Sequence, residues 1–231
     1  MAQVRKGKNV YSGRYLNGEA VYWYDESAEG RIYNGSFKFT QSYYDFPNDK
    51  IKMSIRGLYR ENNKTGVWNF TNRRNGESCE LKVEYSNGQH NGIYQYKSVG
   101  KSNSINFKSG VSFLHITMHN GHPIGEIKGS FGNGHFKGFC DDMGVPDGTW
   151  SMDLSATPLC RMDYEVWENG TIKDSYSIDT STGDRKPHTG TLVDLLSSYI
   201  YRECYKLEKI IEKGSSQWKG EILTRKTTET L

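Results

Sequence analysis

The sequence predicts an all-β fold, a long antiparallel meander of β-hairpins followed by one amphipathic α-helix near the C-terminus. Three observations predict it. Asn-Gly pairs recur along the chain, a glycine followed two residues later by an aromatic residue recurs between them, and an apolar stripe of helical period appears only from Thr191 to Lys213. The first two features are typical of hairpins and half-buried strands.

The composition fits a folded protein whose core is built from rings. Of 231 residues, 25 are glycine and 16 are tyrosine, whereas leucine, isoleucine, valine and phenylalanine together number 45. The net charge is only +3 and aromatic residues make up 13%, which differs from the high charge and few aromatics of disordered chains. So few aliphatics argue against a doubly wound enzyme, whose buried parallel strands are rich in Val, Ile and Leu, and so many glycines argue against a helical bundle.

The expected turns are the Asn-Gly pairs, because a type I′ hairpin turn needs positive φ at both central residues. The eight pairs begin at Asn17, Asn34, Asn75, Asn87, Asn91, Asn120, Asn133 and Asn169. Asp147-Gly148 is a ninth expected turn. The pair at Asn91 follows the pair at Asn87 too closely to be a second turn, so it is expected inside a strand.

The glycine-aromatic units are expected to place a glycine and a ring on one face of the sheet, because residues two apart in a strand share a face. They include Gly13-Arg-Tyr15, Gly35-Ser-Phe37, Gly57-Leu-Tyr59, Gly66-Val-Trp68, Gly92-Ile-Tyr94, Gly129-Ser-Phe131, Gly134-His-Phe136 and Gly148-Thr-Trp150. If Asn87-Gly88 is a two-residue turn, Val83 faces Gly92 and Tyr85 lies diagonal to it. Gly92 is then expected to receive the Tyr85 ring on its bare backbone.

These units resemble MORN repeats in their looser bacterial form. The resemblance rests on the segments Tyr85–Tyr96, Asp142–Trp150 and Tyr59–Phe70, and it extends over residues 11 to 180. It implies an elongated, twisted antiparallel sheet of stacked hairpins. It also implies a bacterial, cytoplasmic protein that binds another protein, in some relatives as an antitoxin or immunity partner, and phospholipid binding is a further role of the family.

The C-terminal helix is expected over residues 191–213. Its stripe consists of Leu192, Leu195, Leu196, Tyr199, Ile200, Cys204, Leu207, Ile210 and Ile211. Thr191 and Asp194 have capping-box spacing, and Gly214 is placed where a helix-ending glycine belongs. We expect a β-repeat domain over 1–188, a helix at 189–214 that packs on the sheet, and a tail or final strand at 215–231. Self-association or partner binding through the helix is the alternative.

The best binding candidates are six aromatic residues that are expected to line one face of the sheet. They are Tyr59, Trp68, Phe70, Tyr94, Tyr96 and Trp150. An extended aromatic surface on rigid strands suits protein partners or stacked sugars. The alternative is that these rings pack against one another, their glycines and the C-terminal helix.

Other candidate sites are weaker. His115, His119 and His122 flank an expected turn and could share one face, but no carboxylate or cysteine is placed to complete a metal site. Acidic residues cluster at two further expected turns, where they are ordinary turn residues. These acids are Asp141, Asp142 and Asp147, and Glu77 and Glu80.

The sequence therefore predicts a non-catalytic interaction or scaffold module without cofactor or metal. It has no GxSxG, P-loop, HExxH or strand-linked GxGxxG motif, and a pI near 8.5 is too weakly basic to predict nucleic-acid binding. Four scattered cysteines without CxxC, and a basic start without an apolar run, favour reduced thiols and a cytoplasmic location. The alternatives are a carbohydrate-binding protein or hydrolase that uses the aromatic face with Asp141, Asp142 or Asp147, and a phospholipid-binding surface.

Overall fold

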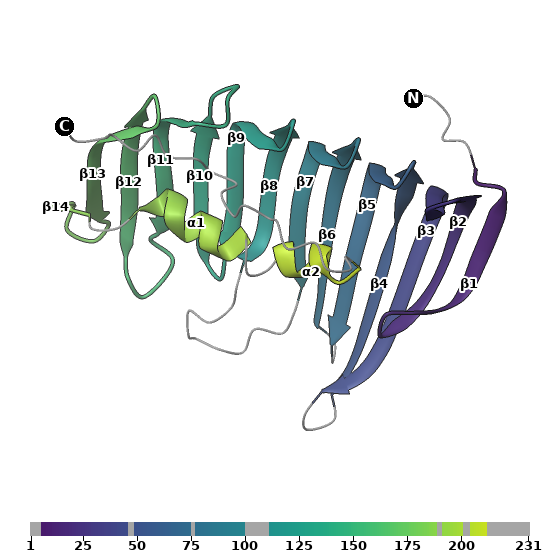
Figure 1. Ribbon diagram of the computed structural model, residues 1–231. Helices are drawn as coiled ribbons and strands as arrows, with labels where there is room; N and C mark the ends of the chain where they lie inside the picture. The colour runs from purple at the N-terminus through teal and green to yellow at the C-terminus, as the bar shows by residue number, and fades with distance from the viewer. Residues whose placement is uncertain are drawn as a thin grey trace.

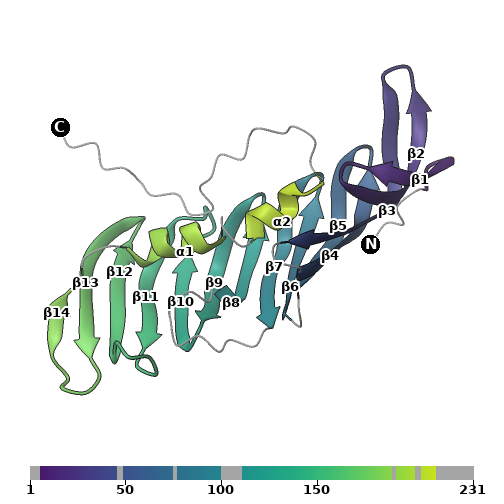
Figure 2. The same ribbon diagram turned by 90° about the horizontal axis from the view of Figure 1, so that it is seen from below.

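A computed structural model describes residues 6–45, 49–74, 77–99, 111–188, 191–200 and 204–211. Its strands form one open antiparallel sheet in which each strand pairs with the next along the chain, which confirms the all-β meander (Figure 1). The strands are β1 (Asn9–Tyr15), β2 (Gly18–Ser27), β3 (Gly30–Asp45), β4 (Asp49–Arg60), β5 (Asn63–Arg74), β6 (Glu77–Ser86), β7 (Gln89–Val99), β8 (Val111–His119), β9 (His122–Phe131), β10 (Gly134–Cys140), β11 (Pro146–Leu154), β12 (Arg161–Glu168), β13 (Thr171–Asp179) and β14 (Arg185–Pro187). The sheet is elongated and twists along its length (Figure 2).

The C-terminal helical region packs on one face of the sheet. It comprises α1 (Leu192–Ile200) and α2 (Lys206–Lys209), which lie along the same face (Figures 1 and 2). One helix was expected over residues 191–213, whereas the structure has two shorter helices in this range. Residues 201–203 between them lie outside the described residues. Gly214 and the expected tail at 215–231 also lie outside them.

Three expected Asn-Gly turns are confirmed, with positive φ at both residues. They are Asn87-Gly88, Asn120-Gly121 and Asn169-Gly170. The Asn17 and Asn133 turns come one residue earlier than the pairs suggest, because Gly18 and Gly134 already begin strands. The turn expected at Asp147-Gly148 is wrong, because both residues lie inside β11. The turn expected at Asn34 is also wrong, because the pair lies inside β3. The pair at Asn91 lies inside β7, as expected, and the pair at Asn75 is outside the described residues.

Pairs inside strands have a different role, because they form bulges. In five hairpins, β2–β3, β4–β5, β6–β7, β8–β9 and β10–β11, one residue of the first strand faces three of the second. Each triplet contains a glycine with positive φ, a conformation that glycine adopts without strain. Two extra residues shift the register by two, so the same side chains stay on the same face beyond the bulge.

The bulge overturns the expectation for Gly92. Val83 pairs with Tyr94 rather than with Gly92, because Glu84 alone faces the triplet that contains Gly92. A Cβ on Gly92 would lie 2.6 Å from the Glu84 carboxyl carbon, and the Ile93 N–H donates to Glu84 Oε2 at 3.3 Å. Gly92 therefore accommodates a carboxylate and not the Tyr85 ring.

Other glycines do receive rings, and two of them, Gly57 and Gly138, form two copies of one unit. A Cβ on Gly57 would lie 2.0 Å from Cδ2 of Trp68, and a Cβ on Gly138 would lie 2.2 Å from Cδ2 of Trp150. Each indole N–H then donates to the carbonyl oxygen of the residue after its glycine, at 3.0 Å in both copies. The missing side chain thus lets the ring lie against the neighbouring strand. There the backbone carbonyl oxygen satisfies the indole N–H, which is the one polar group of the ring.

The core lies on the face that carries the helices. From β1 to β7 it is a continuous series of ring contacts through Tyr11, Tyr22, Phe37, Trp68, Tyr85, His90 and Tyr94. Leu192 and Leu196 of α1, and Leu207 of α2, are buried in the same core. The Asp194 N–H donates to Thr191 Oγ1 at 3.2 Å, which confirms Thr191 as the helix cap.

Candidate functional site

The six aromatic candidates lie in the core and not on an exposed surface. Trp68, Phe70, Tyr94, Tyr96 and Trp150 are each at most 3% exposed. Tyr59 is partly buried and packs edge-on against Trp68, with ring centroids 4.9 Å apart. In this conformation they cannot form a partner-binding surface. They pack against one another, against glycines and, for several, beneath the helices, which was the alternative interpretation.

A buried carboxylate, Glu208 of α2, lies among polar side chains of β6 and β7. Its Oε1 accepts a hydrogen bond from the Tyr94 hydroxyl at 2.8 Å. Its Oε2 accepts one from the Tyr85 hydroxyl and lies 2.8 Å from Nε2 of His90. Both carboxylate oxygens are therefore satisfied by the strands on which α2 lies.

Charges around Glu208 keep it ionised despite its burial. Burial alone would raise the pKa of the carboxyl group, but the charge and hydrogen bond of His90, the Tyr85 hydroxyl and the Lys64 ammonium together lower it. Lys64 is itself only 8% exposed, and its Nζ lies 5.2 Å from the Tyr85 ring centroid. Burial and the Glu208 charge raise the pKa of Tyr94, so this hydroxyl stays a donor.

A second buried carboxylate holds the start of α1. Glu165 of β12 is fully buried. Its Oε1 accepts a hydrogen bond from the Leu192 N–H at 2.6 Å, and its Oε2 accepts one from the Trp167 indole at 3.0 Å. A negative charge at the first turn of a helix is stabilised by the exposed backbone N–H groups there. Glu165 therefore fixes where α1 begins on the sheet.

A third cluster brings a serine, a histidine and an aspartate together near the β14 edge. Ser177 Oγ donates directly to Asp163 Oδ1 at 2.5 Å. Nδ1 of His188 lies 3.3 Å from Ser177 Oγ and 3.8 Å from Asp163 Oδ1. In a catalytic triad the imidazole stands between hydroxyl and carboxylate and uses both ring nitrogens. Here one nitrogen faces both groups, so the cluster joins strands rather than activating Ser177.

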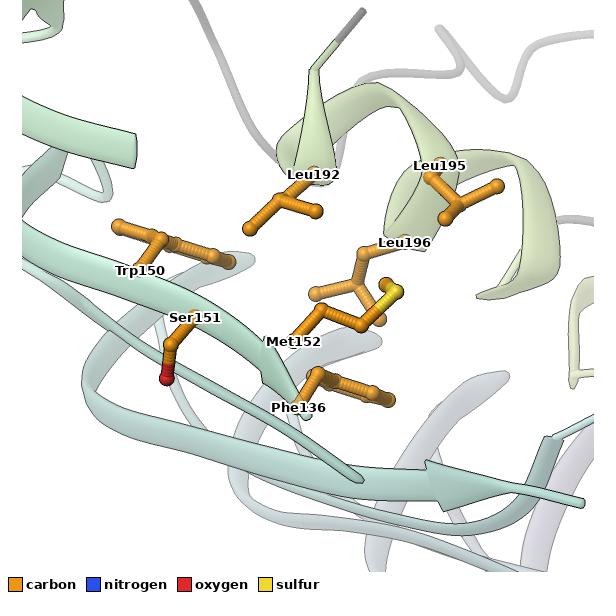
Figure 3. Close-up of a pocket in the computed structure, with 7 residues that line it drawn as sticks. All are labelled: Phe136, Trp150, Ser151, Met152, Leu192, Leu195 and Leu196. Carbon is orange, nitrogen blue, oxygen red and sulfur yellow. The ribbon is translucent and has the colours of Figure 1, made fainter. Parts of the chain in front are cut away.

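The pocket between α1 and the sheet is too small and too apolar to bind a substrate. Its volume is about 10 Å³, close to the lower limit for one water molecule. It is lined by Phe136, Trp150, Ser151, Met152, Leu192, Leu195 and Leu196. Ser151 points away from the helix (Figure 3). This gap is a packing defect beneath α1.

The remaining expected site residues do not form a reactive centre. His119 pairs with His122 across the turn as expected, but no group of His, Cys, Asp or Glu that could hold a metal exists among the described residues. Asp141 Oδ1 accepts the Met143 and Val145 N–H groups at 2.9 Å, so this acid shapes a turn. Burial raises the pKa of the Cys140 thiol to about 12, which makes it a poor nucleophile.

The opposite face of the sheet, which we call the outer face, carries an ordered set of polar side chains. One cross-strand row runs through β3 to β10 with each residue paired to the next. Its residues are Lys38, Arg56, Asn69, Lys82, Gln95, His115, Lys128 and Lys137. We call these eight residues the basic row. At about 4.8 Å per strand it is about 34 Å long.

Exposed apolar side chains flank the basic row. Val67, Ile93 and Phe139 of the outer face are 37%, 38% and 46% exposed. Glu80, Glu84 and Glu126 lie on the same face, and Lys128 is 3.1 Å from Glu126. A non-obligate protein interface combines an apolar centre with a polar rim, and these side chains offer both kinds of contact.

Sequence reasoning missed the three carboxylate clusters and the basic row. Glu208 had a detectable signal, because it lies four residues after Cys204 and so interrupts the apolar stripe of the expected helix. Asp163, Glu165 and Trp167 are two residues apart and so share one side of their strand. Two acidic residues in such a pattern are equally typical of a strand face exposed to solvent. The row needs the register of eight strands, which no local pattern contains.

A scan against protein-family models gives no match for this chain, and a search of curated proteins gives none either. The likeness to MORN repeats therefore stays a prediction from sequence. In the described part of the chain, no helix is both long enough and apolar enough to cross a membrane.

Proposed function

We propose that this protein is a non-catalytic interaction module with a MORN-like architecture, and that it binds another protein through its outer face. The observation that carries the proposal is the exposure of Val67, Ile93 and Phe139 beside the basic row, on the face opposite the helices. Apolar side chains that stay exposed on a rigid sheet are suited to anchor a partner.

The buried groups support a non-catalytic role. Glu208 holds α2 and Glu165 holds α1 on the sheet. Asp163 accepts hydrogen bonds from the Ser177 hydroxyl and, at 3.2 Å, from Nε of Arg161. A catalytic acid or base must reach a substrate atom, and these carboxylates are at most 6% exposed. Five of the six aromatic residues are buried and Tyr59 is partly buried, which favours the interaction module over the carbohydrate alternative.

The finer parts of the proposal are a bacterial, cytoplasmic protein and an antitoxin- or immunity-type partner, as the MORN resemblance implies. A cytoplasmic location is supported by the four cysteines, which all lie within the described residues and form no disulfide there, since disulfides are rare in that compartment.

The test is capture of a partner by the tagged protein from an extract of its native cell. Ile93→Asp on the outer face should abolish capture of a stoichiometric partner, because it places a charge at an apolar contact. Leu195→Asp on α1 is the matched control, since Leu195 is also 38% exposed but lies on the other face.

Two results would contradict the proposal. One is a protein that stays monomeric and captures nothing. The other is loss of capture by Leu195→Asp and not by Ile93→Asp, which would move the interface to the C-terminal helix.

A further inference from the structure

We infer that the basic row binds an acidic, extended segment of the partner protein. This inference rests on the proposed function and names the chemistry of its partner. Lys38, Arg56, Lys128 and Lys137 are exposed and Lys82 is partly exposed. Together they present five cations in register along the outer face.

The cross-strand pairing of the basic row places like charges next to each other, which destabilises the sheet. Lys38 is paired directly with Arg56, and Lys128 directly with Lys137. Like charges directly opposite one another in a sheet are destabilising. Glu126 offsets the charge of Lys128, but no ion pair is found for Lys38, Arg56 or Lys137 within the described ranges. Carboxylates of a bound segment would neutralise both like-charged pairs.

The dimensions suit an extended polypeptide. Side chains on one side of an extended strand recur about every 6.7 Å, so a row of about 34 Å corresponds to about ten residues with five carboxylates on one side. Long lysine side chains can adjust to the difference between this repeat and the strand spacing. Arg56 can hold a carboxylate with two parallel hydrogen bonds.

The neutral members of the row favour polypeptide over nucleic acid. Asn69 and Gln95 interleave the cations, and their amide groups can both donate to and accept from a peptide backbone. The row contains no Phe, Tyr or Trp, and its one ring is the His115 imidazole. Single-stranded nucleic acids are bound by stacking successive bases on several aromatic side chains. The apolar residues Val67 and Ile93 beside the row suit side chains of a protein segment.

The experiment measures binding of a fluorescein-labelled peptide of about twelve glutamates by anisotropy, at about 50 mM salt, where exposed charges are weakly screened. Arg56→Glu with Lys82→Glu should weaken binding about tenfold or more, because two attractive sites become repulsive. Lys128→Glu with Lys137→Glu should do the same at the other end of the row.

The matched control is Lys173→Glu with Lys186→Glu, which makes the same change in net charge at exposed residues of β13 and β14 outside the row. It should change the affinity by less than about twofold. Unchanged thermal unfolding of all three double variants verifies that each is folded.

Four results would overturn the inference. They are the absence of peptide binding, an equal loss in the control, tighter binding of a single-stranded oligonucleotide of equal charge, and tighter binding of anionic lipid vesicles. If the peptide fails to bind but the row variants still lose the partner in the capture experiment, the acidic chemistry is wrong and the proposed function stands.

Discussion

The packing of single residues explains why glycine is abundant in this sheet. Gly57 does not have a positive φ, so its backbone conformation would accept alanine. What excludes a side chain there is the Trp68 indole, whose Cδ2 would be 2.0 Å from the new Cβ. The constraint is therefore steric contact with a neighbouring strand and not turn geometry.

Gly57→Ala should lower the free energy of unfolding by about 1–3 kcal/mol, the usual cost of overpacking a core. Gly138→Ala should behave alike, because it occupies the same place beneath Trp150. Chemical denaturation measures both values. In a Trp68→Leu background the Gly57 substitution should cost less, since the indole is absent, and a strictly additive pair would contradict the steric explanation.

Glu208 should make stability depend on pH. Its folded-state pKa lies below the ordinary value, so its contribution is present above the unfolded pKa and is lost as the pH falls toward the folded value. We expect the free energy of unfolding to decrease as the pH drops below about 4.3, the ordinary glutamate pKa. Denaturant titrations at a series of pH values measure this slope.

Glu208→Gln is the control for this titration, because it keeps the shape of the side chain and removes its ionisation. The variant should be less stable at pH 7, and its stability should fall less steeply in acid. Glu208→Ala leaves Tyr85, His90 and Tyr94 without their acceptor, and it should cost about 3 kcal/mol or more. Parallel pH profiles for the wild type and Glu208→Gln would contradict an ionised Glu208.

At the scale of elements, α1 is held by a contact made far away in the sequence. Glu165→Ala would leave the Leu192 N–H and the Trp167 indole without their buried acceptor, at a cost of about 1–3 kcal/mol for each group. Thr191→Ala removes the cap, whose hydrogen bond to the Asp194 N–H is exposed, and should cost about 1 kcal/mol. Hydrogen exchange of the α1 amides should accelerate more in Glu165→Ala, and the reverse order would contradict the anchoring role.

Much of this element structure could be predicted from local sequence. Asn87-Gly88 marks its hairpin because the required backbone conformation belongs to those two residues alone. The bulge at Gly92 could not be predicted in the same way, because it depends on Glu84 of the partner strand. Asp147-Gly148 shows the same ambiguity, since positive φ at glycine suits a bulge as well as a turn.

The candidate site was less predictable than the fold. Trp68 and Trp150 were correctly expected on one face of the sheet, but whether that face is covered depends on where the helices lie. The apolar stripe that contains Leu207 predicted only that the helix packs against some surface, and not which part of the sheet it covers. Lys82 looked like an ordinary strand lysine, because its cross-strand neighbours are far away in the sequence.

At the scale of the whole molecule, the sheet is open and each strand pairs only with its neighbours in the chain. Stability in such a linear array is close to a sum of local units and their interfaces. The helices add longer contacts, but α2 lies near β5 to β7 and α1 near β10 to β12. The strands before β5 therefore depend mainly on their own rings.

Phe39→Ala should accordingly destabilise one end of the molecule without the other. Phe39 of β3 is 1% exposed, and losing its ring should cost about 3–5 kcal/mol locally. Native-state hydrogen exchange should accelerate in β1 to β4 and stay unchanged in β10 to β13, because no strand pairing links these regions directly. Leu154→Ala in β11, also buried at 3% exposure, is the reciprocal variant and should give the opposite pattern. Uniform acceleration along the chain in either variant would mean that the sheet unfolds as one cooperative unit and that its helices couple the two ends.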